Sequence, residues 1–257
     1  MNITIETLLI ICPLTFLAGF IDSIAGGGGL ISLPSYLLIG LPSHAALGTN
    51  KFSSSIGTLI ATLRYAKNRQ IHFKSALPAA IAALFGSYAG ALLALAFDEK
   101  FLRILLVALL PVMALFILTR KKFGEKSRVS ELPIKRVIAL SAITGLALGA
   151  YDGFFGPGTG TFLILAFTGV IGLDLATASG NTKVVNLASN IAAVTAFITG
   201  GSVVFAIGVP AAVSGMLGNW LGSGLAVKNG AKVIRPVFIG VLVLLFGKVL
   251  WDFIKCS

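Results

Sequence analysis

Charged residues are scarce in this sequence. Asp, Glu, Lys and Arg together make up only 11 % of the 257 residues, whereas hydrophobic residues make up 56 %. Soluble domains contain about 25 % charged and roughly 45–50 % apolar residues. The scarcity of charge therefore excludes an ordinary soluble globular domain and indicates an integral membrane protein.

Cysteine and histidine are nearly absent, with two of each. Cys12 lies in an apolar stretch and Cys256 is the second-last residue, so neither their number nor their spacing fits a disulfide framework or a metal site. The glycine-rich runs described below also lack the Gly-Lys-Ser/Thr sequence of a nucleotide-binding loop. We therefore expect no metal and no cofactor.

Acidic residues are few relative to basic ones, 9 against 20, which gives a formal net charge of +11. In a soluble chain this excess would suggest a nucleic-acid partner. Here the basic residues lie in loops between apolar stretches, where Lys and Arg fix the orientation of a membrane protein. We therefore expect a lipid bilayer around the chain and no nucleic-acid partner.

Long apolar stretches, in contrast to charged residues, are abundant in the sequence. A helix that spans a bilayer needs about 20 apolar residues. Eight stretches of this kind occur, at 5–24, 45–64, 75–97, 101–119, 134–153, 176–198, 203–226 and 233–254, together with two shorter apolar pieces at 29–39 and 159–171. The fold class that these stretches predict is an all-α, multi-pass integral membrane protein.

The sequence is duplicated. A Gly-Phe-Ile-Asp motif at 19–22, followed by a run of glycines, recurs 130 residues later as Gly-Ala-Tyr-Asp at 149–152, followed by Gly156, Pro157 and Gly158. Gly-Thr-Asn-Lys at 48–51 recurs 132 residues later as Gly-Asn-Thr-Lys at 180–183. We expect two homologous halves, 1–119 and 134–257, joined by a cytoplasmic linker, 120–133. Each half would contain four long helices and one short segment.

The charges of equivalent loops favour inverted halves. The loop region 64–74 carries four basic residues, whereas its counterpart at 199–202 carries no charge. In the next loop the charges sum to zero in the first half, whereas the second half carries three basic residues. Opposite charge bias indicates opposite orientation. This arrangement requires the short pieces 29–39 and 159–171 to act as broken or partial crossings. In the parallel alternative they are re-entrant loops.

Both short pieces follow a sequence that a regular helix does not tolerate. Four glycines stand at 26–29, and Pro157 lies between two glycines in the second half. Glycine costs about 1 kcal/mol and proline about 3 kcal/mol in a helix relative to alanine. Paired interruptions at matching positions indicate a transporter substrate site, and free N–H groups at a helix start favour an anion. Close helix packing is the alternative. The candidate residues in these two breaks are Gly27, Gly28, Gly158 and Thr159.

Lys51 and Lys183 are basic residues that lie a few positions inside their predicted spans. A lysine at a span centre costs about 2.5–3.5 kcal/mol and suggests a functional site. Amides and hydroxyls adjoin each lysine, and we include Thr49, Asn50, Asn181 and Thr182 in the candidate anion site. Three roles remain open for the lysines: contact with the substrate or a gate, structural pairing with an aspartate, and extension to the membrane surface.

Asp22 and Asp152 are nearly the only acidic residues within the predicted spans. Each carboxylate could pair with a lysine, cap a broken helix by accepting N–H bonds, or carry a proton in a coupled cycle. We favour the structural roles, a cap or an ion pair, over coupling.

The two motifs together resemble those of the sulfite exporter TauE/SafE family of bacterial membrane transporters. The resemblance is carried by residues 19–29, Pro34, 48–51 and 57–58 in the first half, and by 151–160 and 179–183 in the second. It covers the whole chain. It implies a carrier in the cytoplasmic (inner) membrane for small anions such as sulfite or organosulfonates, without enzymatic activity.

These observations predict a secondary transporter, an exporter of small anions that works by alternating access around a central site. An anion channel that uses the same residues is the second reading, and an intramembrane aspartyl enzyme is a third. The third is disfavoured because the Gly-x-Gly-Asp motif of that enzyme class is missing. Assembly as a homo-oligomer is left open.

Overall fold

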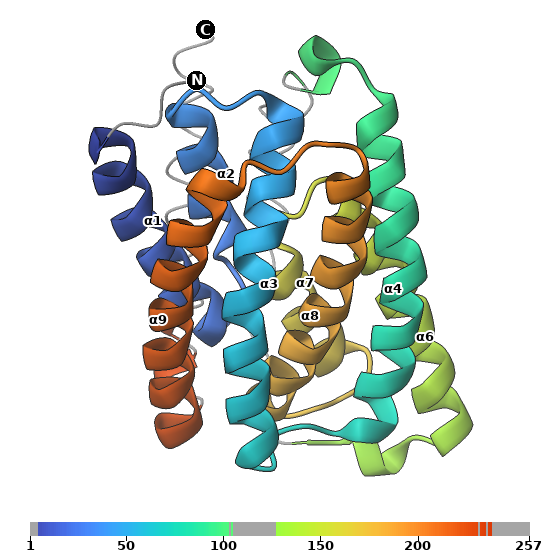
Figure 1. Cartoon of the computed structure of the whole chain (residues 1–257). Helices are drawn as coiled ribbons and strands as arrows, with labels where there is room; N and C mark the ends of the chain where they lie inside the picture. Colours follow the sequence, from blue (N-terminus) through green and yellow to red (C-terminus); the bar gives the residue numbers. More distant parts are fainter. Residues whose placement is uncertain (1–4, 103, 105–126, 231, 235, 238–257) are drawn as a thin grey trace, which may run out of the picture.

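The computed structural model describes residues 5–102, 104, 127–230, 232–234 and 236–237, and these residues form a helical bundle with no β-strand among them (Figure 1). The predicted all-α fold is confirmed for this part of the chain. Most of the expected spans 101–119 and 233–254, and residues 120–126 of the expected linker, lie outside the described residues. The elements are α1 (Ile5–Ala25), α2 (Gly29–Leu38), α3 (Ser43–Lys67), α4 (Phe73–Ala96), η1 (Val129–Glu131), α6 (Ile134–Phe154), α7 (Thr159–Gly169), α8 (Leu175–Thr199) and α9 (Phe205–Asn229).

Five of these helices, α1, α4, α6, α8 and α9, are long and apolar enough to cross a membrane. The predicted span 45–64 does form a helix, α3, and its 25 residues are sufficient to cross. It is not among the five because polar residues are concentrated around Lys51. Thr49, Asn50, Lys51 and Ser53 are all buried in the bundle, so the polarity of α3 faces the protein interior and not lipid.

Both predicted helix breaks are present. The first separates α1 from α2 at residues 26–28, and the second separates α6 from α7 at residues 155–158. Gly26 and Gly156 have left-handed backbone conformations, with φ of +76° and +94°. Residues with a Cβ rarely adopt this conformation, which explains why glycine occupies the same position in both breaks.

The helices pack in pairs that mirror each other across the duplication. The 130–132-residue offset relates α1 to α6, α3 to α8 and α4 to α9. The contact between α1 and α9 therefore has its counterpart in α6 and α4, and the contact between α3 and α9 has its counterpart in α8 and α4. Small residues allow the close approach: a Cβ on Gly218 would lie 2.0 Å from the Phe16 carbonyl oxygen of α1, and one on Gly86 would lie 2.3 Å from the Leu146 carbonyl oxygen of α6.

The central helices α3 and α8 run antiparallel. Thr49, near the start of α3, accepts a hydrogen bond from the Val204 N–H just before α9, at 3.0 Å. Asn181, near the start of α8, accepts one from the His72 N–H just before α4, at 2.8 Å. The equivalent loops at 68–72 and 200–204 consequently lie at opposite ends of the bundle, as Figure 1 shows.

The first N–H groups of α3 are capped by the carboxylate of Glu99, which lies three residues past the end of α4. Glu99 accepts hydrogen bonds from the backbone N–H groups of Ser43 and His44, and the His44 Nδ1 lies 3.1 Å from Glu99 Oε2. Partial burial by itself would raise the pKa of Glu99, but the hydrogen bonds from Ser43 and His44 and the charge of His44 outweigh burial and lower this pKa below its ordinary value.

We expect this cap to become weaker in acid. Because the pKa of Glu99 is lowered by folding, its contribution to stability is present above the ordinary glutamate pKa, near 4.3, and is lost as pH falls through the lowered value. The melting temperature of Glu99→Gln in detergent should therefore lie below that of the wild type at neutral pH and approach it in acid. A difference that does not change with pH would contradict the cap.

Candidate functional site

The two helix breaks meet face to face. A Cβ on Gly26 would lie 2.3 Å from the backbone carbon of Gly160, and one on Gly29 would lie 3.2 Å from Pro157 Cα. The Thr161 hydroxyl donates to the Ala25 carbonyl oxygen at 3.1 Å. The non-helical backbone of each half is thus buried against the other half and kept away from lipid, where unpaired polar groups would be costly.

Replacing Gly26 by alanine should disrupt this crossing, and Gly40→Ala is a matched control. Both glycines have left-handed φ, +76° and +85°, but nothing lies within 4 Å of a Cβ at Gly40. The control should cost only the conformational term, about 1–2 kcal/mol. Gly26→Ala adds a collision with backbone that has no room to move, so its loss of thermal stability in detergent should be several times larger. Equal losses in the two variants would refute the tight crossing.

Two buried ion pairs join the halves crosswise. Lys51 Nζ lies 2.7 Å from Asp152 Oδ2, and Lys183 Nζ lies 2.7 Å from Asp22 Oδ2. The lysine side chains are 2 % and 0 % exposed, so neither extends to a membrane surface. Each pair combines the lysine of one half with the aspartate of the other.

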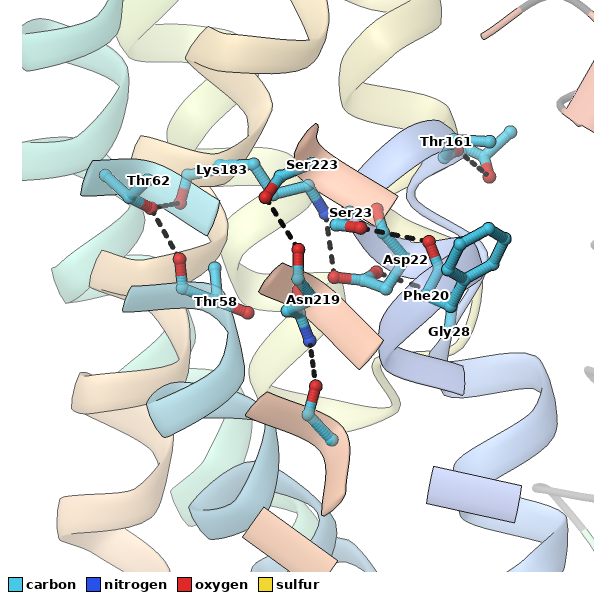
Figure 2. Close-up of polar contacts among 12 residues, drawn as sticks. Phe20, Asp22, Ser23, Gly28, Thr58, Thr62, Thr161, Lys183, Asn219 and Ser223 are labelled. Carbon is cyan, nitrogen blue, oxygen red and sulfur yellow. Dashed lines mark hydrogen bonds and ion pairs between the residues drawn. The ribbon is translucent and has the colours of Figure 1, made fainter. Parts of the chain in front are cut away.

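The surroundings of the two pairs differ. Lys51 Nζ also donates to Asn190 Oδ1 at 3.2 Å, and Asp152 Oδ2 accepts a hydrogen bond from Ser189 Oγ at 2.5 Å. In the other pair, Lys183 Nζ also donates to the backbone oxygen of Asp22, and Asp22 Oδ1 accepts a longer bond, 3.4 Å, from the Gly28 N–H (Figure 2). The Asp22 side chain is 19 % exposed, against 7 % for Asp152.

A cavity lies beside the crossing of the breaks. Its polar lining comes from α1 (Thr15, Asp22), α2 (Ser32), α3 (Asn50, Lys51, Ser53, Ser54, Thr58), α8 (Asn186, Asn190), α9 (Asn219) and the second break with its flanks (Asp152, Thr159). The space that the centre of a water molecule can reach is about 50 Å³, which is room for about three to five waters or one small oxyanion. Among the described residues, no three or more His, Cys, Asp and Glu side chains are grouped as metal ligands would be.

Half of the predicted site residues line this cavity: Lys51, Asn50, Gly28, Thr159, Asp22 and Asp152. The cavity lining does not include Gly27, Gly158 or Thr182. These residues are the sequence neighbours of Gly28, Thr159 and Lys183, respectively. Lys183 stands behind Asp22 as its partner. Thr49 and Asn181 instead hold interhelical loops through Val204 and His72.

Asn219, Thr58, Thr15 and Ser32 also line the cavity, and sequence reasoning did not select them. Asn219 could have been selected from the sequence, because it is an amide within the otherwise apolar stretch 203–226. It also aligns with Ser87 in the duplication. The three hydroxyl residues carried no such signal, since serine and threonine are common in membrane helices.

Comparisons with known proteins identify a family of membrane transporters. Residues 11–249 match the family described as Sulfite exporter TauE/SafE. The chain is 37 % identical over 238 residues to the probable membrane transporter protein ORF9 of a Sinorhizobium species, covering 92 % of this chain and 90 % of that one. It is 34 % identical over 252 residues to a probable membrane transporter protein of Haemophilus influenzae, covering 98 % of both chains.

A third relative is the probable membrane transporter protein YfcA of Escherichia coli K12, 35 % identical over 257 residues, with 97 % of this chain and 94 % of the relative covered. No solved structure matches the chain significantly.

Proposed function

The chain belongs to the sulfite exporter TauE/SafE family of membrane transporters, and from this premise we propose that it is a secondary carrier that exports small anions through the cytoplasmic membrane. The observation that carries the proposal is Lys51: a lysine that is 2 % exposed, lines a small polar cavity and lies at the crossing of two broken helices. A buried ammonium with amides and hydroxyls around it is suited to hold an oxyanion.

In this proposal the anion takes the place of the Asp152 carboxylate at Lys51. Asp152 keeps the hydrogen bond from Ser189 when the ion pair opens, so its carboxylate does not lose all of its partners. Gly28 directly precedes α2, and Thr159 is the first residue of α7. Both residues line the same cavity. The positive ends of these short helices then add to the attraction for a negative ligand.

We further propose that the two halves, 1–119 and 134–257, are inverted repeats. The mirrored helix contacts, the antiparallel α3 and α8, and the opposite charge bias of equivalent loops support this arrangement. Rocking of one repeat against the other would expose the cavity to alternate sides. The ion pairs Lys51–Asp152 and Lys183–Asp22 bridge the repeats, so such a motion must loosen at least one of them.

The repeat arrangement predicts opposite accessibility for two loops. In a variant whose native Cys12 and Cys256 are replaced, a single cysteine placed at 68–72 should react with a membrane-impermeant thiol reagent only from the cytoplasmic side of cells or vesicles. A cysteine at 200–204 should react only from the other side. Labelling of both loops from one side would exclude inversion.

We propose sulfite and organosulfonates as substrates, and the membrane potential or the proton gradient as the driving force. An anion that leaves an inside-negative cell gains about 2.3 kcal/mol per charge per 100 mV. The proposal is tested by measuring efflux of labelled sulfite from proteoliposomes with an imposed potential. A carrier gives saturable flux and counterflow, whereas conductance far above carrier turnover would favour the alternative, an anion channel. Flux no greater than in protein-free liposomes, across sulfite, sulfoacetate, taurine, thiosulfate and sulfate, would refute both.

A further inference from the structure

We propose that Gly215 is a specificity-determining residue. Because it has no side chain, it leaves room in the cavity for the uncharged part of a bound anion, and the residue at this position sets the largest anion that the cavity admits. This inference rests on the proposed function, because it takes the cavity to hold an anion. It adds selection by size at a named position, which neither the family nor the lysine implies.

Gly215 differs from the other glycines of α9 in having free space where a side chain would begin. A Cβ at each of the other four would lie 3.0 Å or less from an atom of a neighbouring helix; these four are Gly208, Gly218, Gly222 and Gly224. Apart from the backbone of α9 itself, a Cβ at Gly215 would have one neighbour within 4 Å, the Thr15 carbonyl oxygen at 3.5 Å. That distance is an ordinary van der Waals contact. Close packing therefore explains four of the five glycines and leaves Gly215 unexplained.

The free space beside Gly215 belongs to the cavity. Gly215 is a buried residue and part of the cavity lining, so a side chain at this position would not point into lipid. Unfilled space next to a buried lining residue is cavity space. A methyl group there would take the place of about one water molecule, in a cavity with room for about three to five.

Helix propensity gives no reason for glycine at this position. Gly215 lies in the interior of α9 (Phe205–Asn229), where the backbone is helical. Glycine weakens a helix interior relative to alanine, because it loses more conformational freedom on folding. Neither the backbone conformation nor packing thus requires glycine here, and the room that it leaves in the cavity accounts for its presence.

The duplication supplies an internal comparison. The residue equivalent to Gly215 is Ala83 of α4, which is 0 % exposed and does not line the cavity. The Ala83 methyl group packs against α6, since a Cβ on Gly149 would lie 3.0 Å from it. The position that a methyl group fills on one side of the pseudosymmetric bundle is therefore left empty on the side where the cavity lies.

The ammonium of Lys51 and Gly215 lie toward different ends of the cavity. Lys51 Nζ bonds Asp152 of α6 and Asn190 of α8, whereas Gly215 of α9 faces Thr15 of α1. Helix α3 packs against both α8 and α9, but α8 and α9 make little contact with each other. A charged group bound at Lys51 consequently leaves the rest of the ligand free to extend toward Gly215.

The lining around Gly215 is suited to an uncharged group. Helices α1 and α9 contribute three further small residues to it, Ala18, Gly19 and Ala211. The polar groups nearby already donate within their own helices: the Thr15 hydroxyl to the Ile11 carbonyl oxygen at 2.8 Å, and Asn219 Nδ2 to the Gly215 carbonyl oxygen at 2.9 Å (Figure 2). The charged end of the anion therefore lies at Lys51 and its uncharged end beside Gly215.

The test compares sulfite with methanesulfonate, which carries a methyl group where sulfite has a lone pair. In proteoliposomes at one pH, Gly215→Ala should lower the ratio of kcat/KM for methanesulfonate to kcat/KM for sulfite by at least about tenfold, because one methyl group too many in a fitted pocket has an effect of this size. A purely structural defect would lower both fluxes by the same factor and would not move the ratio.

Gly169→Ala is a matched control. Gly169 is the last residue of α7, nothing lies within 4 Å of a Cβ there, and the cavity lining does not include it. This variant should leave the ratio unchanged. In detergent, Gly215→Ala should melt at or above the temperature of the wild type, because it gains helix propensity without a collision. A clearly lower melting temperature would mean that there is no free space beside Gly215, and the inference would fail.

Inhibition of labelled sulfite flux by unlabelled methanesulfonate gives the same comparison without requiring methanesulfonate itself to be carried. Gly215→Ala should need at least about tenfold more methanesulfonate than the wild type for equal inhibition. The role of Gly215 would be overturned by equal ratios in the two proteins, or by a wild type that carries sulfite and neither carries nor binds methanesulfonate. Either result leaves the carrier proposal standing, whereas absence of flux of every anion tested would refute the carrier proposal and this inference with it.

Discussion

Replacing Lys51 by methionine is expected to abolish anion transport. Methionine has a similar length and no charge, so the variant removes the ammonium that lines the cavity and little of the packing. Loss of a charge-assisted contact with the substrate in a buried site should reduce flux by on the order of a hundredfold or more. Efflux from proteoliposomes at equal protein content measures the effect.

The controls for Lys51→Met separate transport from folding. The variant leaves the Asp152 carboxylate, which is 7 % exposed, without its cation, and that alone can destabilise the protein. The double variant Lys51→Met, Asp152→Asn removes both charges, so it should regain stability without regaining transport. Lys67→Met changes an exposed lysine at the end of α3 and should transport normally. Wild-type flux in the double variant would show that Lys51 has only a structural role.

Replacing Lys183 by methionine is expected to destabilise the fold more than any loss of a surface charge would. Lys183 is 0 % exposed, and its ammonium bonds both the side chain and the backbone of Asp22. Removal of one partner of a buried pair costs about 3–5 kcal/mol, because the other charge stays buried and uncompensated. For a chain of this size that corresponds to a melting temperature lower by on the order of 10 °C.

Removal of both charges should reverse most of this loss. The variant Lys183→Met, Asp22→Asn leaves no unpaired charge, and replacement of a whole buried pair by neutral residues is often close to neutral in stability. Melting in detergent of the wild type, both single variants and the double variant gives the coupling energy directly. Additive losses in the double variant would mean that Lys183 and Asp22 do not interact as the structure shows.

The helix breaks illustrate what could be predicted from the sequence. Runs of glycine and the Gly156-Pro157-Gly158 sequence make a regular helix unfavourable wherever they occur, because propensity is a local property. The predicted boundaries accordingly agree with the structure to within a few residues along α1, α2, α6 and α7. The duplication was equally visible, since it requires only a comparison of the chain with itself.

The candidate site could be predicted only in part. Lysine and aspartate in apolar spans drew attention, because of their cost in a bilayer, to the region where the structure has its polar cavity. Thr49 and Asn181 were chosen as neighbours in sequence of Lys51 and Lys183, yet their side chains bond loops at the ends of the bundle. Both lie two positions from their lysine, and side chains two positions apart on a helix point to different faces, so proximity in the chain did not make them part of the cavity.

The sequence by itself predicted an all-helical membrane protein with a repeated pair of motifs, two interrupted segments and charges within apolar spans, because composition, the length of apolar stretches and helix propensity act over short distances along the chain. Only the tertiary structure decided that each lysine pairs with the aspartate of the other half, and that the cavity lies on the side of Asn219 and not of Ser87. Both outcomes depend on which helix faces pack together, and that is fixed by contacts between residues more than 100 positions apart.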